Sequence, residues 1–423
     1  MEQRDNPGGE GPAAPGGAGS EGAGAPGAAG AGGSRAAGAG GARAAGDEGA
    51  GAPVTAGSEG ARAAGSGGGA GGAAAGGARS WPPAGAVPSG WPDEGVAAHY
   101  GDPVREQRTM ATGAVVVDRS NRGVVRVGGP DRLTWLHSLT SQHLERLAAG
   151  STAQALILSP NGHVEHHLTL TDDGSAVWMH VEPGTAAALA GFLDSMRFML
   201  RVEIADVSGG YAVLTIAGPD AAKHAEAAKA LAVAGTTGPF GIDLIVPRER
   251  IAEAAAQVDA APAGMWAFEA ARIAARVPRL GVDTDHKTLP HEAGWIETAV
   301  HLGKGCYRGQ ETVARVHNLG HPPRRLVFLD LDGSVDRLPG HGAPVVTADG
   351  TRVGFAGSSA LHFEQGPIGL ALIRRTVPVD ATLLADGIAA AQEVIIAPDA
   401  GANVEVTLRR DSLPPPVGQR RLM

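Results

Sequence analysis

The sequence predicts an α+β protein, in which two related α+β units precede a small antiparallel β-barrel or sandwich. A strand pattern, the tripeptide Gly-Pro-Asp and a helical pattern follow one another twice, with the tripeptides at 129–131 and 218–220. Repetition of one supersecondary unit indicates two related halves. After residue 322 the helical patterns give way to short strand patterns separated by Asp-Gly and Pro turns, which is typical of a small all-β domain.

A long Gly/Ala-rich segment precedes the part that should fold. Residues 1–80 contain no aromatic residue, no leucine and no isoleucine. Such a segment cannot bury enough apolar surface to offset its chain entropy. We therefore expect residues 1–95 to form a disordered tail, and we expect a second flexible tail over 399–423.

Composition and charge argue against several classes of protein. The net charge of -9 argues against a protein that mainly binds nucleic acid. No stretch approaches the roughly 20 apolar residues of a membrane span, and the start of the chain has no apolar signal region. A single cysteine excludes an intramolecular disulfide framework and fits a reducing, cytoplasmic location.

Two turn sequences predict hairpins in the first unit, which should span about 110–208. β-branched residues on both sides of Asn-Arg-Gly predict that 115–118 pairs with 124–127. Ser-Pro-Asn-Gly is a stronger turn, and it predicts that 155–158 pairs with 164–170.

Apolar residues at helical spacing predict helices in both units. Those of the first unit lie at 133–144, where Asp131 can cap the helix, and at 185–199. Those of the second unit, about 209–322, are the Ala-rich segment after the second Gly-Pro-Asp and the segment 265–275, which Val-Pro closes.

The last domain, about 323–398, should consist of short strands. Asp-Gly pairs and prolines separate them, as in antiparallel sheets with tight turns. The predicted strands are 326–331, 344–347, 351–358, 368–373 and 393–396.

The run His-Val-Glu-His-His at 163–167 contains residue types that bind metals, but their spacing on a strand does not bring them together. On a strand, His163, Glu165 and His167 face one way, and His166 faces the other with its apolar neighbours. His163 and His167 would lie about 13 Å apart at roughly 3.3 Å per residue, so they cannot share one ion. We therefore expect no metal site, and His166 is either a core histidine or a residue that lines a pocket.

The single cysteine, Cys306, lies in the polar run Lys304–Glu311, which reads KGCYRGQE. Its glycines permit unusual backbone conformations and the close approach of another group. Lys304 is a cation that can favour a thiolate, and Gln310 and Glu311 can hold a polar ligand. The alternative is a buried and inert cysteine.

A second polar cluster joins Asp283-Thr284-Asp285-His286 to Glu292. It is either a solvated loop or a contact for a nitrogen-rich ligand. The glycine spacing of 303–309 matches neither the dinucleotide nor the Walker loop.

The run Lys304–Glu311 resembles the signature of the YgfZ-type folate-binding proteins, which are relatives of the glycine-cleavage T-protein (aminomethyltransferase) and act in the assembly and repair of iron–sulfur proteins. The flanking segments 289–292 and 313–317 and the paired Gly-Pro-Asp helix starts agree with it. The resemblance covers about 110–395. It implies a ring of two related α+β units over 110–322, a C-terminal β-barrel, and tetrahydrofolate or a derivative in the central channel.

The resemblance also implies roles for individual residues. Cys306 would be a reactive or transiently ligating thiol, and Lys304 would raise its thiolate fraction. Iron–sulfur client or assembly proteins would be the partners. The implied folate contacts are Gly305, Tyr307, Gln310, Glu311, Glu292, Arg272, His166 and Arg315.

Two departures from the T-protein pattern bear on activity. His166 and His167 stand where the T-protein has an aspartate pair used in catalysis, and Ala274 stands where it has a glutamate that contacts the pterin. An imidazole is a poor substitute for a fixed anion. A folate-binding accessory protein is therefore favoured, and a tetrahydrofolate-dependent aminomethyltransferase or demethylase is the alternative. Glu269 could replace the missing glutamate, and a scaffold without folate is a third possibility.

Overall fold

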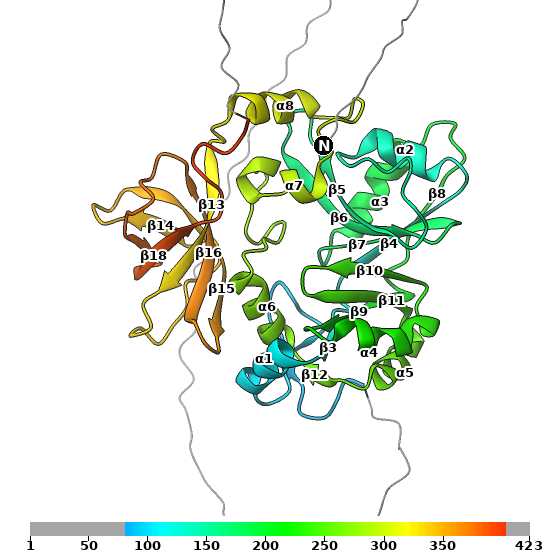
Figure 1. Cartoon of the computed structure of the whole chain (residues 1–423), viewed down its shortest axis with the longest axis horizontal. Coiled ribbons are helices and arrows are strands. Elements are labelled where there is room, and N and C mark those ends of the chain that lie inside the picture. The colour runs from blue at the N-terminus through cyan, green and yellow to red at the C-terminus, as the bar shows by residue number, and fades with distance from the viewer. Residues whose placement is uncertain (1–80, 403–423) are drawn as a thin grey trace, which may run out of the picture. The chain divides into compact units, whose positions relative to one another are not determined.

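The computed structural model describes residues 81–402, which form a mixed α+β region followed by a closed antiparallel β-barrel (Figure 1). This architecture confirms the predicted fold class. The tails predicted over 1–80 and 403–423 lie outside the described residues.

The first sheet has the strand order β5-β6-β7-β4-β8, and each neighbouring pair is antiparallel. Its strands are β4 (Gly123–Gly128), β5 (Thr152–Leu158), β6 (Val164–Asp172), β7 (Ala176–Val181) and β8 (Glu203–Asp206). Helices α2 (Arg132–Leu139) and α3 (Ala186–Ser195) cover one face. Leu136 and Leu189 from these helices pack on Ile157 and Leu168 of the sheet, which leaves the opposite face available for a site.

The second sheet has the order β10-β11-β9-β3-β12, with β12 parallel to β3 and the other pairs antiparallel. Its strands are β3 (Val115–Asp118), β9 (Tyr211–Ala217), β10 (Ala234–Gly238), β11 (Gly241–Pro247) and β12 (Ala261–Ala263). The accompanying helices are α1 (Pro103–Thr112), α4 (Ala221–Ala228), α5 (Ile251–Val258) and α6 (Met265–Ala274), with 3-10 turns η1 (Lys229–Leu231) and η2 (Arg248–Arg250). Small residues such as Ala225 and Ala254 let α4 and α5 lie close to the strands.

The β-barrel closes in the order β13-β16-β15-β14-β17-β18. Its strands are β13 (Arg324–Leu331), β14 (Pro344–Thr347), β15 (Arg352–His362), β16 (Gly366–Arg374), β17 (Leu383–Ala385) and β18 (Ile388–Val394). The segment between the second sheet and the barrel contains η3 (Pro290–Ala293), α7 (Ile296–Ala299) and α8 (Gln310–Leu319). In Figure 1 this segment lies between the barrel and the first sheet.

Two local predictions are wrong. Strands β3 and β4 do not form a hairpin, because β3 pairs with β9 and β12 while β4 pairs with β7 and β8. The turn between them carries the chain from one sheet to the other. Asp131 makes no side-chain cap on α2, because its carboxylate binds Arg201 at 2.7 Å.

Residues 81–95, which the composition placed in the tail, belong to the described part. Val87–Pro88 forms β1, which pairs with β2 (Ala97–His99), and Asp93 is buried. The prediction failed here because the ordering contacts come from distant residues. Asp93 is held by Arg279, 186 positions along the chain.

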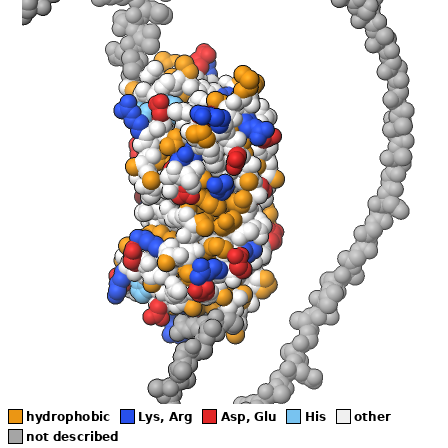
Figure 2. Space-filling view, turned by 90° about the vertical axis from the view of Figure 1, so that its right-hand side faces the viewer, with side chains coloured by type: hydrophobic (Ala, Val, Ile, Leu, Met, Phe, Trp, Pro, Cys, Tyr) orange, Lys and Arg blue, Asp and Glu red, His pale blue; other side chains and the backbone are white. Residues whose placement is uncertain are grey.

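The outer surface carries charges of both signs on the face drawn in Figure 2. Figure 2 shows acidic and basic side chains interspersed on the face seen from the right of Figure 1, without a patch of one sign. Among residues 81–402, no helix is both long enough and apolar enough to cross a bilayer. In the same residues, no cluster of three His, Cys, Asp or Glu side chains could hold a metal ion.

Candidate functional site

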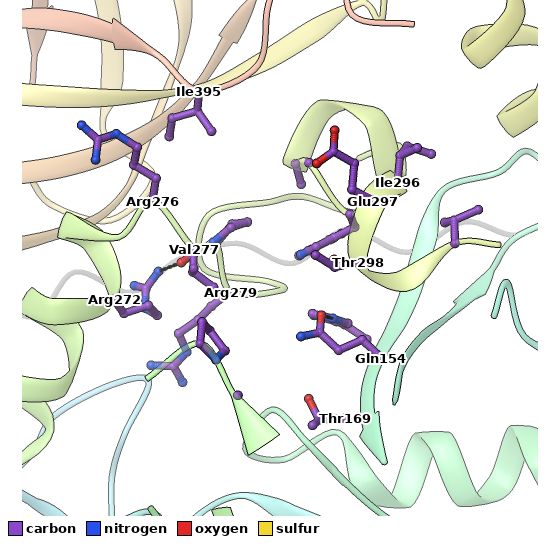
Figure 3. A pocket seen from close by; sticks show the side chains of 18 of the residues that line it. Gln154, Thr169, Arg272, Arg276, Val277, Arg279, Ile296, Glu297, Thr298 and Ile395 are labelled. Carbon is purple, nitrogen blue, oxygen red and sulfur yellow. Dashed lines mark hydrogen bonds between the residues drawn. The ribbon is translucent and has the colours of Figure 1, made fainter. Parts of the chain in front are cut away.

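A cavity of about 950 Å³ lies among the two sheets, the η3–α7 segment and the end of the barrel. Figure 3 shows two different walls. Arg272, Arg276 and Arg279, from α6 and the segment after it, occupy one wall. The other wall presents uncharged polar side chains, among them Gln154 of β5 and Thr169 of β6, together with the carboxylate of Glu297 on α7.

Arg279 is the centre of a buried ion-pair network on the wall that carries the three arginines. Its guanidinium lies 2.8 Å from Asp93, 2.8 Å from Glu182 and 3.1 Å from Glu269. Glu182 also binds Arg122 at 3.0 Å. Burial alone would raise the pKa of Glu182, but Arg122 and Arg279 hold it well below its usual range, so this carboxylate stays charged.

Arg272 extends the same network toward the barrel. It lies 2.6 Å from Glu269 and 3.0 Å from Asp283, and it donates a hydrogen bond to Ser358 of β15. Although burial opposes ionisation, Arg272 and Arg279 lower the pKa of Glu269 to about 2. The arginine-bearing wall is thus a set of fixed charges of both signs, whose partners come from the protein itself.

A third group of charges lies on the second sheet. Asp243 of β11 binds Arg119 at 3.3 Å and His180 at 3.1 Å, and it accepts a hydrogen bond from Thr215. Burial alone would raise the pKa of Asp243, but these partners lower it, so the carboxylate remains ionised. The Arg119 guanidinium also lies over the Phe268 ring at 4.5 Å, and both residues line the cavity.

His167 lies on the same wall of the cavity as Gln154 and Thr169. Its Nε2 lies 3.1 Å from the Gln154 side-chain oxygen, and its ring contacts that of Trp295 at 4.8 Å between centroids. Burial lowers the pKa of His167 to about 4, so the imidazole is neutral at physiological pH. His167 and Gln154 therefore offer hydrogen bonds without a charge.

Acidification should reveal the buried state of His167. An unfolded histidine binds a proton below about pH 6.5, whereas the folded side chain resists until about pH 4, so stability is lost as the pH falls between these values. Wild-type protein should lose about 2 kcal/mol of stability through His167 between pH 6.5 and pH 4.5, and His167→Gln should lack this loss, as measured by urea unfolding. His286→Gln, at an exposed position, is the control. Equal pH dependence in wild type and His167→Gln would contradict this assignment.

The run Lys304–Glu311 lies beside the cavity and contributes no residue to its lining. The Lys304 ammonium binds the backbone carbonyls of His137, Thr140 and Gln142 at the end of α2. It also lies 5.1 Å from the Tyr307 ring. Burial lowers the pKa of Lys304 to about 8. These contacts make Lys304 an anchor of the loop.

The other end of the run is held by close packing. Gly309 has φ 80°, and a Cβ built on it would lie 2.5 Å from the Ser159 carbonyl oxygen in the β5–β6 turn. Arg308 binds Glu165 of β6 at 3.0 Å. Cys306 lies between these anchors and is exposed, so the alternative of a buried cysteine is wrong.

Comparisons with known proteins agree with this architecture. The model of the GCVT N-terminal domain matches residues 91–241. The chloroplastic protein At1g60990 of Arabidopsis thaliana, which carries a transferase-type name, is 25% identical over 62% of this chain and 65% of its own length. The chain thus spans slightly less than two thirds of that relative. An aminomethyltransferase of Symbiobacterium thermophilum is 26% identical over 58% of this chain and 74% of its own length.

The fold itself is shared with a solved structure. The glycine cleavage system aminomethyltransferase T from Bartonella henselae matches with a TM-score of 0.63 at 18% identity, over 75% of this chain and 96% of that chain. These findings support the T-protein superfamily. Within this T-protein-like fold, the YgfZ-type assignment stays a prediction.

The predicted ligand contacts occupy different places in the T-protein-like fold. Arg272 lines the cavity, but His166 does not, and its neighbour His167 does. His166 follows the strand alternation to the helix-covered face with Leu168. Three of the other predicted contacts are exposed: Gly305, Glu311 and Arg315. Gln310 is half-buried, and Tyr307 is buried in an apolar cluster.

Glu292 and the acidic cluster are engaged within the protein. The fully buried Glu292 carboxylate binds Arg324 of β13 at 2.8 Å and accepts the backbone N–H of Leu289. Asp285 binds the same guanidinium at 2.7 Å, and Asp283 binds Arg272. These ion pairs join the α+β region to the barrel, and the contact of Glu292 with a ligand stays a prediction.

Sequence reasoning missed most of the polar residues of the cavity: Arg119, Arg122, Gln154, Thr169, His180, Glu182, Asp243 and Arg279. A signal existed for two of them. His180 and Asp243 are polar side chains within or next to otherwise apolar strand patterns, and buried polar residues of that kind need partners. The pairings themselves carry no local signal.

Gly309 offers a test of the loop packing. Gly309→Ala should lower stability by about 2 kcal/mol, because alanine resists positive φ and its Cβ would meet the Ser159 carbonyl. Thermal unfolding measures this change. Gly305→Ala is the matched control, because a Cβ there would meet open space. Equal melting temperatures for the two variants would contradict the packing role.

Proposed function

We propose that this chain is a folate-binding accessory protein of the YgfZ type, which acts in the assembly or repair of iron–sulfur proteins. Tetrahydrofolate or a derivative would occupy the cavity, and Cys306 would serve a partner protein. The T-protein-like fold and the aminomethyltransferase relatives support the folate part of this proposal. The run Lys304–Glu311 supports the iron–sulfur part.

The observation that carries the proposal is the pair of unlike walls around one cavity. A volume of about 950 Å³ is in the range of small-molecule sites. A pterin is a flat ring with both donors and acceptors, which suits the amide of Gln154, the hydroxyl of Thr169 and the neutral imidazole of His167. The Arg119–Phe268 stack supplies an apolar contact at the same cavity.

The same geometry favours binding over aminomethyl transfer. Transfer needs a group that positions or stabilises the reacting amine, and the position where a T-protein carries aspartate here holds His167, a neutral side chain bound to Gln154. The buried carboxylates that line the cavity, Glu182 and Asp243, are both committed to ion pairs. Glu297 also lines the cavity, at an exposed position on α7.

The exposure of Cys306 supports a contact between its thiol and a macromolecule. Its side chain is exposed, and the loop that carries it is anchored by Lys304 on one side and by Gly309 on the other. One thiolate cannot hold a cluster alone, so a partner's cysteines or a small thiol must complete any ligation. Folate and the partner protein would then bind at two separate sites, the first at the cavity and the second at Cys306.

Calorimetric titration with tetrahydrofolate tests the binding part. We expect one molecule bound per chain, and we expect Gln154→Ala to weaken binding about tenfold by removing one polar contact and freeing His167. Gln365→Ala, an exposed amide in the barrel, is the matched control. Absence of binding would favour the scaffold without folate.

Depletion of the protein tests the iron–sulfur part. Cluster-dependent enzymes should lose activity, and wild-type protein but not Cys306→Ala should restore it. Folate-dependent turnover of an aminomethyl donor would instead favour the transferase alternative. Normal cluster enzymes after depletion, together with full complementation by Cys306→Ala, would refute the role of the thiol.

A further inference from the structure

We propose that His291 and His317 form a carboxylate-binding subsite at the barrel side of the cavity, and that His291 takes up a proton from solvent when a carboxylate ligand binds there. This inference rests on the proposed function, since the ligand is a folate with a glutamate tail. It assigns the binding of the ligand's glutamate carboxylates to His291 and His317.

His291 is the clearest unsatisfied group in the cavity. Its side chain lines the cavity at 5% exposure, and neither ring nitrogen has a hydrogen-bond partner among the described residues. The ring of His317, on α8, lies 6.1 Å away between centroids and lines the same cavity. A buried polar group without a partner is destabilising, and a ligand that supplies the partner would recover this loss.

Among residues 81–402, the groups packed around His291 provide no counter-ion for it. Glu292, the next residue, and Asp285 both bind Arg324, which lies on β13 next to η3. On α8 the facing titratable group is His317. Ile396, which follows β18, and Gly294, which ends η3, complete the apolar surroundings. Burial and the neighbouring His317 lower the pKa of His291 to about 4, so the free protein holds a neutral imidazole.

The opposite side of the cavity disfavours an anion. The connected network there contains four guanidiniums, those of Arg119, Arg122, Arg272 and Arg279. It also contains five carboxylates, those of Asp93, Glu182, Asp243, Glu269 and Asp283, which leaves one negative charge in excess. A donor-rich ring suits that side. The carboxylates of a folate should therefore turn toward the histidines, where Arg276 also borders the cavity beside Ile395 (Figure 3).

Binding of a carboxylate changes the protonation of this subsite. The anion stabilises the imidazolium of His291, so one proton moves from solvent to the ring and forms a charged hydrogen bond with the ligand. Because the free imidazole is unprotonated above about pH 5, uptake occurs from there up to the pKa of the complex. Affinity should then fall by up to tenfold for each unit of rising pH in that interval.

Calorimetry of the full chain in buffers of different ionisation enthalpy measures this uptake. The probes are folinic acid and its pteroate counterpart, which lacks the glutamate. At pH 6.5 we expect uptake of about half to one proton for folinic acid and none for the pteroate. His291→Gln should abolish the uptake and weaken folinic acid about tenfold while leaving the pteroate unchanged, and the exposed control His286→Gln should match wild type.

The outcomes separate the two proposals. Folinic acid and pteroate that bind alike, without proton uptake, would overturn the subsite and leave the proposed function standing. Equal weakening of both ligands by His291→Gln would overturn it too, because the histidine would then act on the cavity as a whole. If neither ligand binds wild-type protein, the proposed function fails and the subsite fails with it.

Discussion

Replacing Arg279 with methionine should lower the free energy of unfolding by about 5 kcal/mol, the upper end of the range for breaking a buried ion pair. The substitution removes the cation shared by Asp93, Glu182 and Glu269, and the side chains involved are at most 16% exposed. Three carboxylates would be left with fewer partners in a region of low dielectric, where an uncompensated charge is most costly. Chemical unfolding of the full chain at neutral pH gives the value.

Two further variants make this result specific. Arg279→Lys keeps a charge but loses the forked geometry that reaches three partners, so its loss should be intermediate. Arg197→Met breaks the exposed pair with Asp194, where the side chains are 47% and 63% exposed, and should change stability by less than about 0.5 kcal/mol. If Arg279→Met unfolds no more easily than Arg197→Met, the network does not stabilise the fold.

Glu292→Ala should cost about 4 kcal/mol, because Glu292 is fully buried and holds both Arg324 and the backbone N–H of Leu289. Because Arg324 begins β13, the substitution should uncouple the barrel from the α+β region. The two parts should then unfold in separate thermal transitions. Differential scanning calorimetry would resolve two transitions in the variant.

The exposed pair of Arg276 and Glu393 provides the matched control. It also joins the α+β region to the barrel, but Glu393 is 52% exposed, so Glu393→Ala should cost at most about 1 kcal/mol. The alternative role for Glu292, direct contact with folate, makes an opposite prediction. Glu292→Ala would then abolish folinic acid binding while leaving both the melting temperature and the single transition unchanged.

The sequence predicts periodic features well and distant pairings poorly. The β5–β6 hairpin follows from Ser-Pro-Asn-Gly, and helix α6 begins at the predicted Met265. Strand β17 was missed because Leu383–Ala385 is too short to show a period. The hairpin predicted for β3 and β4 failed because the turn signal is local, whereas the choice between two sheets depends on β9 and β7.

The candidate site shows the same division. The run KGCYRGQE identifies a loop beside the cavity, yet the cavity lining comes from segments that only the fold brings together. Arg119 meets Asp243 across 124 positions, and Arg279 meets Asp93 across 186. His166 and His167 have nearly identical sequence contexts, and the strand alternation determines which of them reaches the cavity.

A crystal structure of the full chain with folinic acid is the most direct test of the central claim, which is that a reduced folate occupies this cavity. We expect density for the pterin between the wall of Arg272 and Arg279 and the wall of Gln154 and Thr169, with the glutamate directed to His291. Folinic acid ordered at another place on the protein, with this cavity empty in the same crystal, would contradict the account.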